Sequence, residues 1–305
     1  MSGVNARHMA IATAIAVIVS LTACHHPPEK SAELWLGGDV NLGDGGRGQL
    51  QSIAGMVPGT PGIVNLEGPV SEKPADKAHL HLWNSPASLA ELSALNVRVA
   101  GIANNHAGDA GEAGPEQTIK TLRDHGIAPA GGTAGAALFE VNGIQIVIAA
   151  HDLTQGVPAN LEADLAAARR HSQVLIATFH VTGPASFLPR PELRQAVEIA
   201  YHAGANVIVS HGTHALGPVE RRPHAVIAWG LGNMAFACDC TQEEDAMILR
   251  VAVGNDKVVS AEVLPLQAGL NTRPAQPSPE AEAIFNLLEA IGSSPLQRKE
   301  ASAFF

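Results

Sequence analysis

Short apolar runs alternate along the chain with segments in which apolar residues recur at helical spacing. Runs of about four to eight apolar residues bounded by glycine or polar residues are typical of buried strands, and a 3.6-residue period is typical of amphipathic helices. Their alternation predicts an α/β fold. The predicted strands are 33–36, 63–66, 97–103, 173–180 and 206–210, and the predicted helices are 86–96, 115–126, 161–171, 191–204 and 279–292.

Two further segments have the pattern of β-hairpins. Residues 137–150 contain Asn142-Gly143 between two apolar runs, which favours a type I′ turn. Residues 246–266 form the second predicted hairpin. Together with the helix that follows, the closing region 247–292 either packs on the rest of the domain or forms a small appendage.

The N-terminal residues have the pattern of an export signal. Residues 1–8 carry Arg7 and no acid, residues 9–21 are apolar and small, and Leu-Thr-Ala-Cys follows. This resembles a bacterial lipobox, in which Cys24 is acylated and becomes the new N-terminus. A transmembrane anchor is the alternative, but the apolar core is shorter than the ~20 residues that span a bilayer. We therefore expect a signal peptide (1–23), a tether (24–31), a domain (32–305) and a lipid-anchored location on the extracytoplasmic face of the cell envelope.

The hydrophobic content and the net charge of the chain limit which kinds of molecule it can bind. The chain is 46% hydrophobic, enough for a substantial core, and its formal net charge is -10. An acidic surface argues against nucleic-acid binding, which needs clustered Lys and Arg. An anionic polymer would also be repelled unless something cationic lies in the binding site. Cys238 and Cys240 either pair across a short, strained loop, stay as free thiols or take a metal role.

Carboxylate, amide and imidazole side chains follow several of the predicted strands. Ligands of α/β proteins bind beyond the carboxyl ends of the strands, so these side chains are expected to share one edge. His151, which ends another apolar run, is ambiguous, and the other histidines are expected in loops or on helix surfaces. The residues at the shared edge are Asp39, Glu67, Asn104, Asn105, His106, His180, His211, His214 and Asn233.

Carboxylate, amide and imidazole together suit a divalent metal of the Zn, Mn or Fe type. Such an ion acidifies a bound water and polarises an ester or phosphoryl oxygen. A histidine that does not ligate it can protonate a leaving group, because the pKa of histidine lies near neutrality. The chain contains no GxSxG, P-loop or HExxH motif.

Six segments occur in the order found in the CapA family of poly-γ-glutamate capsule synthesis proteins. They are GDVNLG, VNLEGPV, ANNHAGDAGEAG, HVTGP, SHGTHALGPVE and WGLGNMAF, and the resemblance covers roughly residues 34–266. It implies a four-layer αββα sandwich like that of calcineurin-type metallophosphoesterases. By matching positions it also implies a catalytic His106 and the metal ligands Asp39, Glu67, Asn105, His180, His211 and His214.

Some positions depart from the pattern of metallophosphoesterases. Asn41 stands where an Asp-x-His motif would place histidine, and the late histidines have HGTH spacing. The number of bound ions, one or two, therefore stays open. We expect Asn41, Asn104 and Asn233 to support the substrate or the loops. Asp109 is expected either to orient His106 or to cap the following helix, and its position before that helix favours the cap.

The resemblance implies action in the synthesis or export of poly-γ-glutamate or another extracellular polymer, with a metal-dependent, hydrolase-like site. The expected partners are the membrane through Cys24, polymer synthase or export components, and an anionic polymer or phosphate ester. Whether the protein is an enzyme stays open, because fold does not fix function. The alternatives are a non-catalytic protein that binds polymer or assembles a synthase, and a periplasmic phosphatase or nucleotidase.

Overall fold

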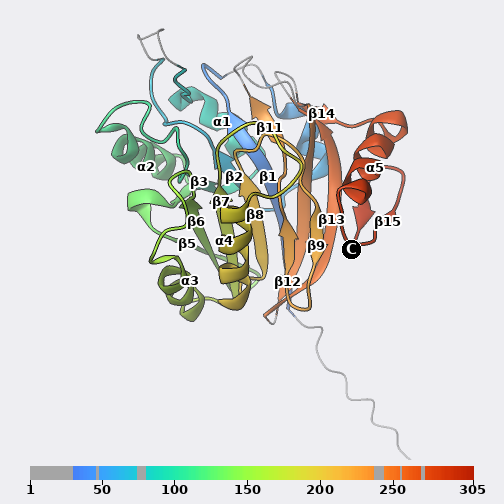
Figure 1. Ribbon diagram of the computed structural model, residues 1–305. Coiled ribbons are helices and arrows are strands. Elements are labelled where there is room, and N and C mark those ends of the chain that lie inside the picture. Colours follow the sequence, from blue (N-terminus) through green and yellow to red (C-terminus); the bar gives the residue numbers. More distant parts are fainter. Residues whose placement is uncertain (1–29, 46–47, 74–79, 237–243, 255, 269–271) are drawn as a thin grey trace, which may run out of the picture.

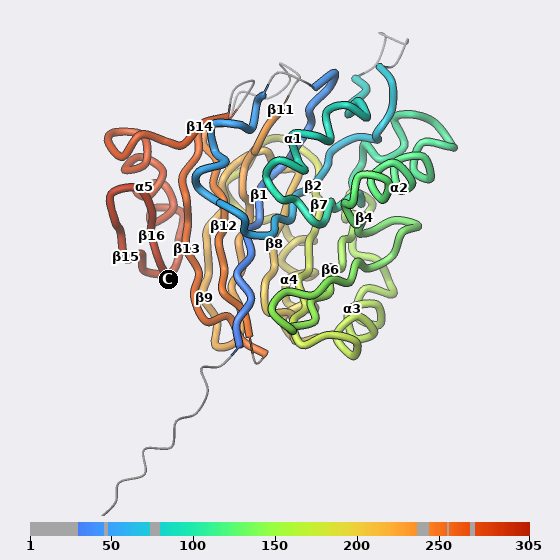
Figure 2. The backbone as a smooth tube through the Cα atoms, turned by 180° about the vertical axis from the view of Figure 1, so that it is seen from behind, coloured from blue at the N-terminus to red at the C-terminus, as the bar shows by residue number. Residues whose placement is uncertain are grey.

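Two β-sheets lie face to face, and helices cover their outer faces (Figure 1; Figure 2 gives the view from behind). The computed structural model describes residues 30–45, 48–73, 80–236, 244–254, 256–268 and 272–305. The protein is therefore a four-layer αββα sandwich, as the resemblance to the CapA family implies.

The first sheet carries a parallel half that continues into an antiparallel half. Strands β1 to β4 run parallel to one another, and β12 pairs with β1 in the opposite direction. In spatial order the sheet contains β15 (Gln297–Arg298), β16 (Ala303–Phe304), β13 (Lys257–Gln267), β12 (Asp245–Gly254), β1 (Ala32–Asn41), β2 (Gly62–Leu66), β3 (Val97–Gly101) and β4 (Ala128–Ala130), with β11 (Asn233–Phe236) paired to β1 and β14 (Arg273–Pro274) paired to β13.

The second sheet has a parallel centre with an antiparallel strand at each edge. Its central strands β7 and β8 are buried along their whole length. In spatial order it contains β5 (Ala137–Val141), β6 (Ile144–Asp152), β7 (Val174–His180), β8 (Val207–His211), β10 (Val226–Ala228) and β9 (Val219–Arg221).

The helices form the two outer layers and one edge of the molecule. Helices α1 (Leu89–Ala94) and α2 (Gly114–Asp124) cover the first sheet, whereas α3 (Leu161–Arg170) and α4 (Pro191–His202) cover the second (Figures 1 and 2). Helix α5 (Glu282–Ala290) lies beside β13 near the C-terminus. The shorter helical turns are η1 (Gln51–Met56), η2 (Pro86–Ser88), η3 (Gly132–Ala134) and η4 (Pro277–Ala281).

Alternating side chains of each central strand enter different cores. In β1, Leu34 and Leu36 pack between the sheets, whereas Trp35 packs under the helices of the first sheet. In β7, Ile176 packs between the sheets and Phe179 packs under α3 and α4. Because both faces of these strands are covered, they appear in the sequence as nearly continuous apolar runs.

The structure confirms the predicted strands and helices, with differences at their ends. Strand β1 continues beyond Leu36 to Asn41, because its second half pairs with β11 and β2 after a shift of register. The predicted helix 86–96 divides into η2 and α1. The hairpin 137–150 is present, and Asn142 and Gly143 both have the positive φ of a type I′ turn.

The closing region is part of the sandwich rather than an appendage. Strand β12 pairs with β1 in the middle of the first sheet, and β13 pairs with β12. Among the described helices, none is long and apolar enough to cross a membrane. The predictions about residues 1–29, including Cys24, and about Cys238 and Cys240 lie outside the described residues.

Candidate metal centre

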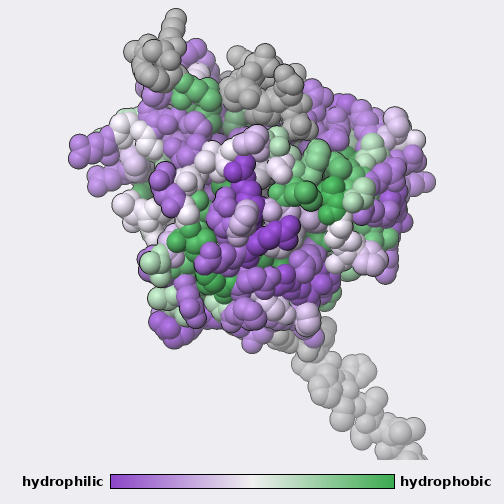
Figure 3. All heavy atoms as spheres, in the orientation of Figure 1, coloured by the Kyte–Doolittle hydropathy of each residue, from purple (hydrophilic) through white to green (hydrophobic). Residues whose placement is uncertain are grey.

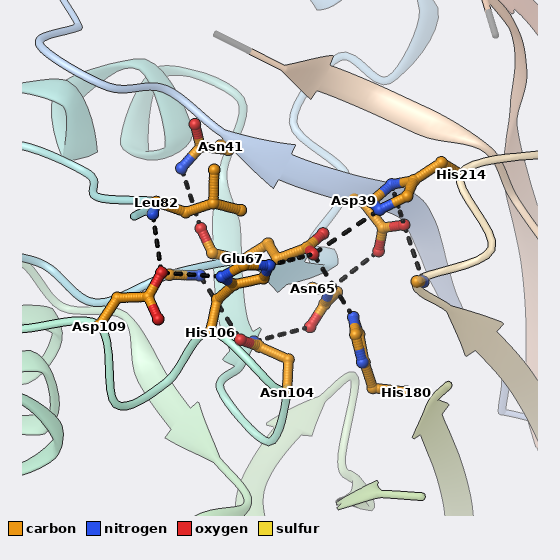
Figure 4. Close-up of polar contacts among 12 residues, drawn as sticks. Asp39, Asn41, Asn65, Glu67, Leu82, Asn104, His106, Asp109, His180 and His214 are labelled. Atoms are coloured by element: carbon orange, nitrogen blue, oxygen red, sulfur yellow. Dashed lines mark hydrogen bonds and ion pairs between the residues drawn. The ribbon is translucent and has the colours of Figure 1, made fainter. Parts of the chain in front are cut away.

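Six of the predicted site residues meet between the two sheets, at the carboxyl ends of the parallel strands (Figure 4). The first sheet supplies the ends of β1, β2 and β3, and the second supplies the ends of β7 and β8. This is the edge at which α/β proteins bind ligands. The residues that meet are Asp39, Glu67, His106, His180, His211 and His214.

Asp39 forms one side of the centre and is buried. Its Oδ1 accepts a hydrogen bond from Asn65 Nδ2 (2.8 Å), and its Oδ2 accepts one from the Gly212 amide (2.9 Å). His211 Nδ1 and His214 Nδ1 each lie 3.4 Å from an oxygen of this carboxylate. Burial alone would raise the pKa of Asp39, but these two imidazoles lower it well below its usual value. Asp39 is therefore a stable carboxylate anion.

Glu67 forms the other side and faces three imidazoles. Its Oε1 lies 3.7 Å from His180 Nε2, 3.8 Å from His214 Nε2 and 4.0 Å from His106 Nε2. Its Oε2 is buried and has no hydrogen-bond partner among the described residues. The same is true of both ring nitrogens of His180. Buried polar atoms are normally paired, so these atoms indicate a ligand that binds between them.

The separations between these nitrogen and oxygen atoms fit ligands of a metal ion. Distances of 3.4 to 4.0 Å exceed an ordinary hydrogen bond. Two ligands that each lie ~2.1 Å from one ion at a tetrahedral angle are about 3.4 Å apart. One ligand atom from each of Asp39, Glu67 and His214 lies within 4.8 Å of the others. The donor set of carboxylate and imidazole therefore suits Zn, Mn or Fe.

His214 lies between the two carboxylates. Its burial lowers the pKa of the imidazole, but Asp39 and Glu67 outweigh this effect and raise the pKa to about 9. Its Nδ1 donates a hydrogen bond to Asn233 Oδ1 at 2.9 Å. Asn233 thereby fixes the orientation of the ring, and Nε2 faces Glu67.

A glycine makes the spacing of the late histidines possible. A Cβ at Gly212 would lie 2.0 Å from the Val181 carbonyl oxygen and 2.6 Å from the ring of His180. Gly212 and His214 both have positive φ, so the chain turns sharply here. This turn brings His211 and His214 beside the carboxylate of Asp39.

His106 is oriented by Asp109, which corrects the expected helix cap. His106 Nδ1 lies 2.7 Å from Asp109 Oδ2, which also accepts a hydrogen bond from the Leu82 amide at 2.8 Å. Helix α2 begins at Gly114 with Ala113 as its N-cap, and no side chain caps it. Asp109 lies too early in the loop to reach the first turn, so it holds the Nδ1 side of His106 instead.

Asn104 and its neighbour lie on opposite sides of the same turn. Asn104 is buried, and its Nδ2 donates to the Leu66 carbonyl oxygen at 2.9 Å. Asn105 is exposed, because the chain turns directly after Asn104 with a hydrogen bond from the Ala107 amide to the Asn104 carbonyl. This geometry argues against the predicted ligand role of Asn105. Asn104 instead supports the loop that carries Glu67.

Asn41 and Asn84 hold the same loop from its other side. Asn41 Nδ2 donates to the carbonyl oxygens of Glu67 and Trp83, both at 3.0 Å. Asn84 Nδ2 donates to the Glu67 carbonyl at 3.0 Å, and Asn84 Oδ1 accepts from the Leu42 amide. Asn41 therefore faces backbone carbonyls at the position where Asp-x-His would place an imidazole.

The sequence reasoning missed Asn65 and Asn84. Asn65 lies two residues before Glu67, so its side chain leaves β2 on the same side. That spacing is a signal which could have identified it. Asn84 lies in an irregular segment, and its role depends on a loop closure that the sequence pattern does not show.

Comparison with known sequences identifies the family. Residues 60–238, more than half of the chain, match the sequence model described as "Bacterial capsule synthesis protein PGA_cap". The chain belongs to this family. The matched segment of this PGA_cap protein contains Glu67 and all four histidines of the centre, whereas Asp39 precedes it.

Two curated relatives support this membership. The chain is 29% identical over 230 residues to the PGA biosynthesis protein CapA of Bacillus subtilis (strain 168), which covers 66% of this chain and 60% of the relative. It is 22% identical over 246 residues to the capsule biosynthesis protein CapA of Bacillus anthracis, which covers 72% and 59% respectively. The match thus spans about 60% of the length of these relatives.

One solved structure shares the fold at low sequence identity. A hypothetical protein from Thermus thermophilus has a TM-score of 0.53 at 13% identity, and the match covers 77% of this chain and 99% of that chain. A putative 5'-nucleotidase from Staphylococcus aureus has a TM-score of 0.48 at 12% identity, covering 86% and 58%. The first likeness concerns the fold alone, and the second score is too low to establish even that.

Proposed function

We propose that this PGA_cap protein is a divalent-metal-dependent hydrolase of the cell envelope, which acts on an anionic polymer during capsule or poly-γ-glutamate synthesis or export. The proposal rests on one observation. Two buried carboxylates and four imidazoles converge at distances that suit metal ligands, and several of their buried atoms have no partner among the described residues. The printed names of the relatives supply the polymer class.

The candidate ligands fall into two groups that share His214. Asp39 and His211 form one group, and Glu67 and His180 form the other. One tightly held ion, or one tight and one weak, fits this arrangement. A bound divalent ion would polarise a carbonyl or phosphoryl oxygen and lower the pKa of a water.

His106 is placed to move a proton. Asp109 accepts the hydrogen on Nδ1, so the free Nε2 points toward Glu67 and the centre. With a proton on Nε2 as well, His106 would pass that proton to the leaving group while the remaining histidines hold the ion.

The fold suggests how the centre is oriented if Cys24 is lipidated. Strand β1 begins at Ala32 and reaches the centre at Asp39, close to its other end. Strands rise about 3.3 Å per residue, so the tether would join the sheet more than ~20 Å from the metal. The centre would then face away from the membrane, toward polymer outside the cytoplasm.

Metal content and hydrolysis test the proposal together. The protein is purified without chelators, its metal is measured by elemental analysis, and turnover is measured on γ-linked polyglutamate and bis(p-nitrophenyl) phosphate with Mn²⁺, Zn²⁺ or Fe²⁺. We expect about one or two ions per chain and metal-dependent cleavage. A protein that cannot be loaded with any of these ions contradicts the proposal. A loaded protein that cleaves neither substrate favours a binding role, and one that cleaves only the phosphate ester favours a phosphatase.

A further inference from the structure

A cationic group besides the proposed metal ion would favour the binding of an anionic substrate, because the protein carries a net charge of -10 and the centre holds two carboxylates. Five of the described arginines form ion pairs with acidic residues. These arginines are Arg169, Arg222, Arg250, Arg273 and Arg298.

Arg190 is held against the segment that follows His180. Its Nη2 donates to the Pro184 carbonyl at 3.3 Å. The guanidinium also packs against Gly183, where an added Cβ would come within 2.0 Å of Nη2 and 2.6 Å of Cζ. Its Nε is buried and has no hydrogen-bond partner among the described residues. The group is thus fixed in place, and Nη1 makes no hydrogen bond within the part of the chain that the structure describes, so it can donate to a ligand.

Arg194 joins Arg190 on the same segment. Its Nε donates to the Pro189 carbonyl at 3.2 Å, and its guanidinium lies 5.8 Å from the centre of the Trp229 ring. Within the part of the chain that the structure describes, neither arginine belongs to an ion pair with a carboxylate. Glu192 lies between them in the sequence. Its single negative charge offsets only one of the two guanidinium charges, so residues 190–194 keep a net positive charge.

The distance to the centre is limited by the length of the chain. Gly183 follows His180 by three residues, which span at most about 11 Å when extended. A γ-linked glutamate unit has five backbone atoms and spans about 6 Å when extended, so about two units cover that distance and three exceed it. The face that carries α4 is mostly hydrophilic, with apolar patches between the hydrophilic areas (Figure 3).

We propose that Arg190, assisted by Arg194, forms an oxyanion subsite that binds a carboxylate or phosphate of the substrate within about two units of the bond that is cleaved. The planar fork of a guanidinium matches both oxyanions with two parallel hydrogen bonds. The subsite deepens the proposed function and rests on its anionic substrate. It gives an acidic protein a local means of attracting an acidic polymer.

The test compares four full-length proteins: wild type, Arg190→Gln, Arg190→Lys and the control Arg123→Gln. Arg123 is exposed near the end of α2, about 15 Å along the helix from the loop of the centre, and the control changes the charge equally. Calorimetry at low salt measures the binding of a γ-linked glutamate decamer and of inorganic phosphate to the metal-loaded proteins. Metal content and melting temperature are measured in parallel.

We expect Arg190→Gln to weaken binding at least about tenfold, Arg190→Lys to weaken it less, and Arg123→Gln to leave it unchanged. Metal content should be equal in all four. Weakening for the decamer alone supports the subsite with a polymer carboxylate as its ligand, and weakening for phosphate alone supports it with a phosphate ester.

Unchanged binding of both probes by Arg190→Gln overturns the subsite and leaves the metal-dependent function standing. Wild-type protein that holds metal but binds neither anion also overturns it. A metal-free wild type contradicts the proposed function, whereas the difference between Arg190→Gln and Arg123→Gln still decides the subsite. If Arg190→Gln does not fold, Arg190→Lys and Arg194→Gln take its place, and binding equal to wild type by both overturns the proposal.

Discussion

The first sheet supplies the centre with both carboxylates, whereas the second sheet supplies His180, His211 and the loop that carries His214. The two contributions also differ in how they are held. Asp39 accepts hydrogen bonds from Asn65 and from the Gly212 amide. The ring nitrogens of His180, by contrast, have no hydrogen-bond partner among the described residues.

This difference shows which side of the centre is complete before a ligand binds. Asparagine side chains fix the loop of Glu67 through its backbone, so the oxygen ligands are preorganised. On the facing sheet, neither ring nitrogen of His180 has a hydrogen-bond partner within the described residues, whereas His214 is held by Asn233 and Asp39. A bound ion would join the two sheets, so metal binding and the stability of the sandwich should be coupled.

The largest effect is expected in turnover when His106 is changed. His106→Ala should keep its metal and its fold but lose about 10²–10⁴-fold in hydrolysis, because it removes the proposed proton donor. Asn105→Ala is the matched control, because Asn105 is the exposed neighbour in the same turn. Full activity of His106→Ala would show that His106 is not the acid, and loss of metal would show that it is a ligand.

Asp39 tests the side of the centre that the first sheet supplies. Asp39→Asn keeps the size of the side chain but removes the charge that faces His211 and His214, so metal affinity should fall at least about 100-fold. Asp44→Asn is the control, because Asp44 is exposed just after β1. Metal titration of the three proteins measures the change, and equal affinities would exclude Asp39 as a ligand.

Removal of the metal tests whether the ion joins the sheets. At a free metal concentration a thousandfold above its Kd, binding to the folded state adds about 4 kcal/mol of stability. For a chain of this size we expect chelation to lower the melting temperature by about 8 °C. Asp39→Asn should show little response to the chelator. A wild-type melting temperature that does not change on chelation would contradict the coupling.

The effect of pH on the stability of the metal-free protein is expected to be smaller than the effect of chelation. The pKa of His214 is raised from an ordinary 6.5 to about 9 by Asp39 and Glu67 after burial has opposed it. Its protonated form therefore adds about 3 kcal/mol to the free energy of unfolding, fully present below pH ~6.5 and lost as pH rises through about 9. Melting temperatures of chelated wild type and His214→Gln between pH 6 and 10 measure this. Parallel curves for the two proteins would show that His214 does not titrate in this way.

Much of the centre could be predicted because parallel strands align their carboxyl ends. Glu67, His180 and His211 needed only the strand pattern and the rule that ligands bind beyond such ends. Their neighbours in irregular loops could not be predicted so well. Whether Asn104 or Asn105 faces inward depends on a single turn, since a rotation by one residue exchanges their positions.

The same reason explains the remaining differences in the site. Asp109 precedes a predicted helix, so the sequence favours a cap, but the length and path of the loop bring it to His106 instead. Asn84 reaches the backbone of Glu67 across 17 positions of the sequence. Contacts of this kind depend on tertiary packing, which local patterns of polar and apolar residues do not contain.

The most direct measurement is the anomalous scattering of a crystal of the protein purified without chelators, collected at the absorption edges of Mn, Fe and Zn. We expect a peak between Asp39, Glu67 and His214, within about 2.0–2.2 Å of a carboxylate oxygen and an imidazole nitrogen. A second, weaker peak would indicate a second ion. The absence of any peak at this position, in crystals also soaked with each metal, would contradict the metal centre.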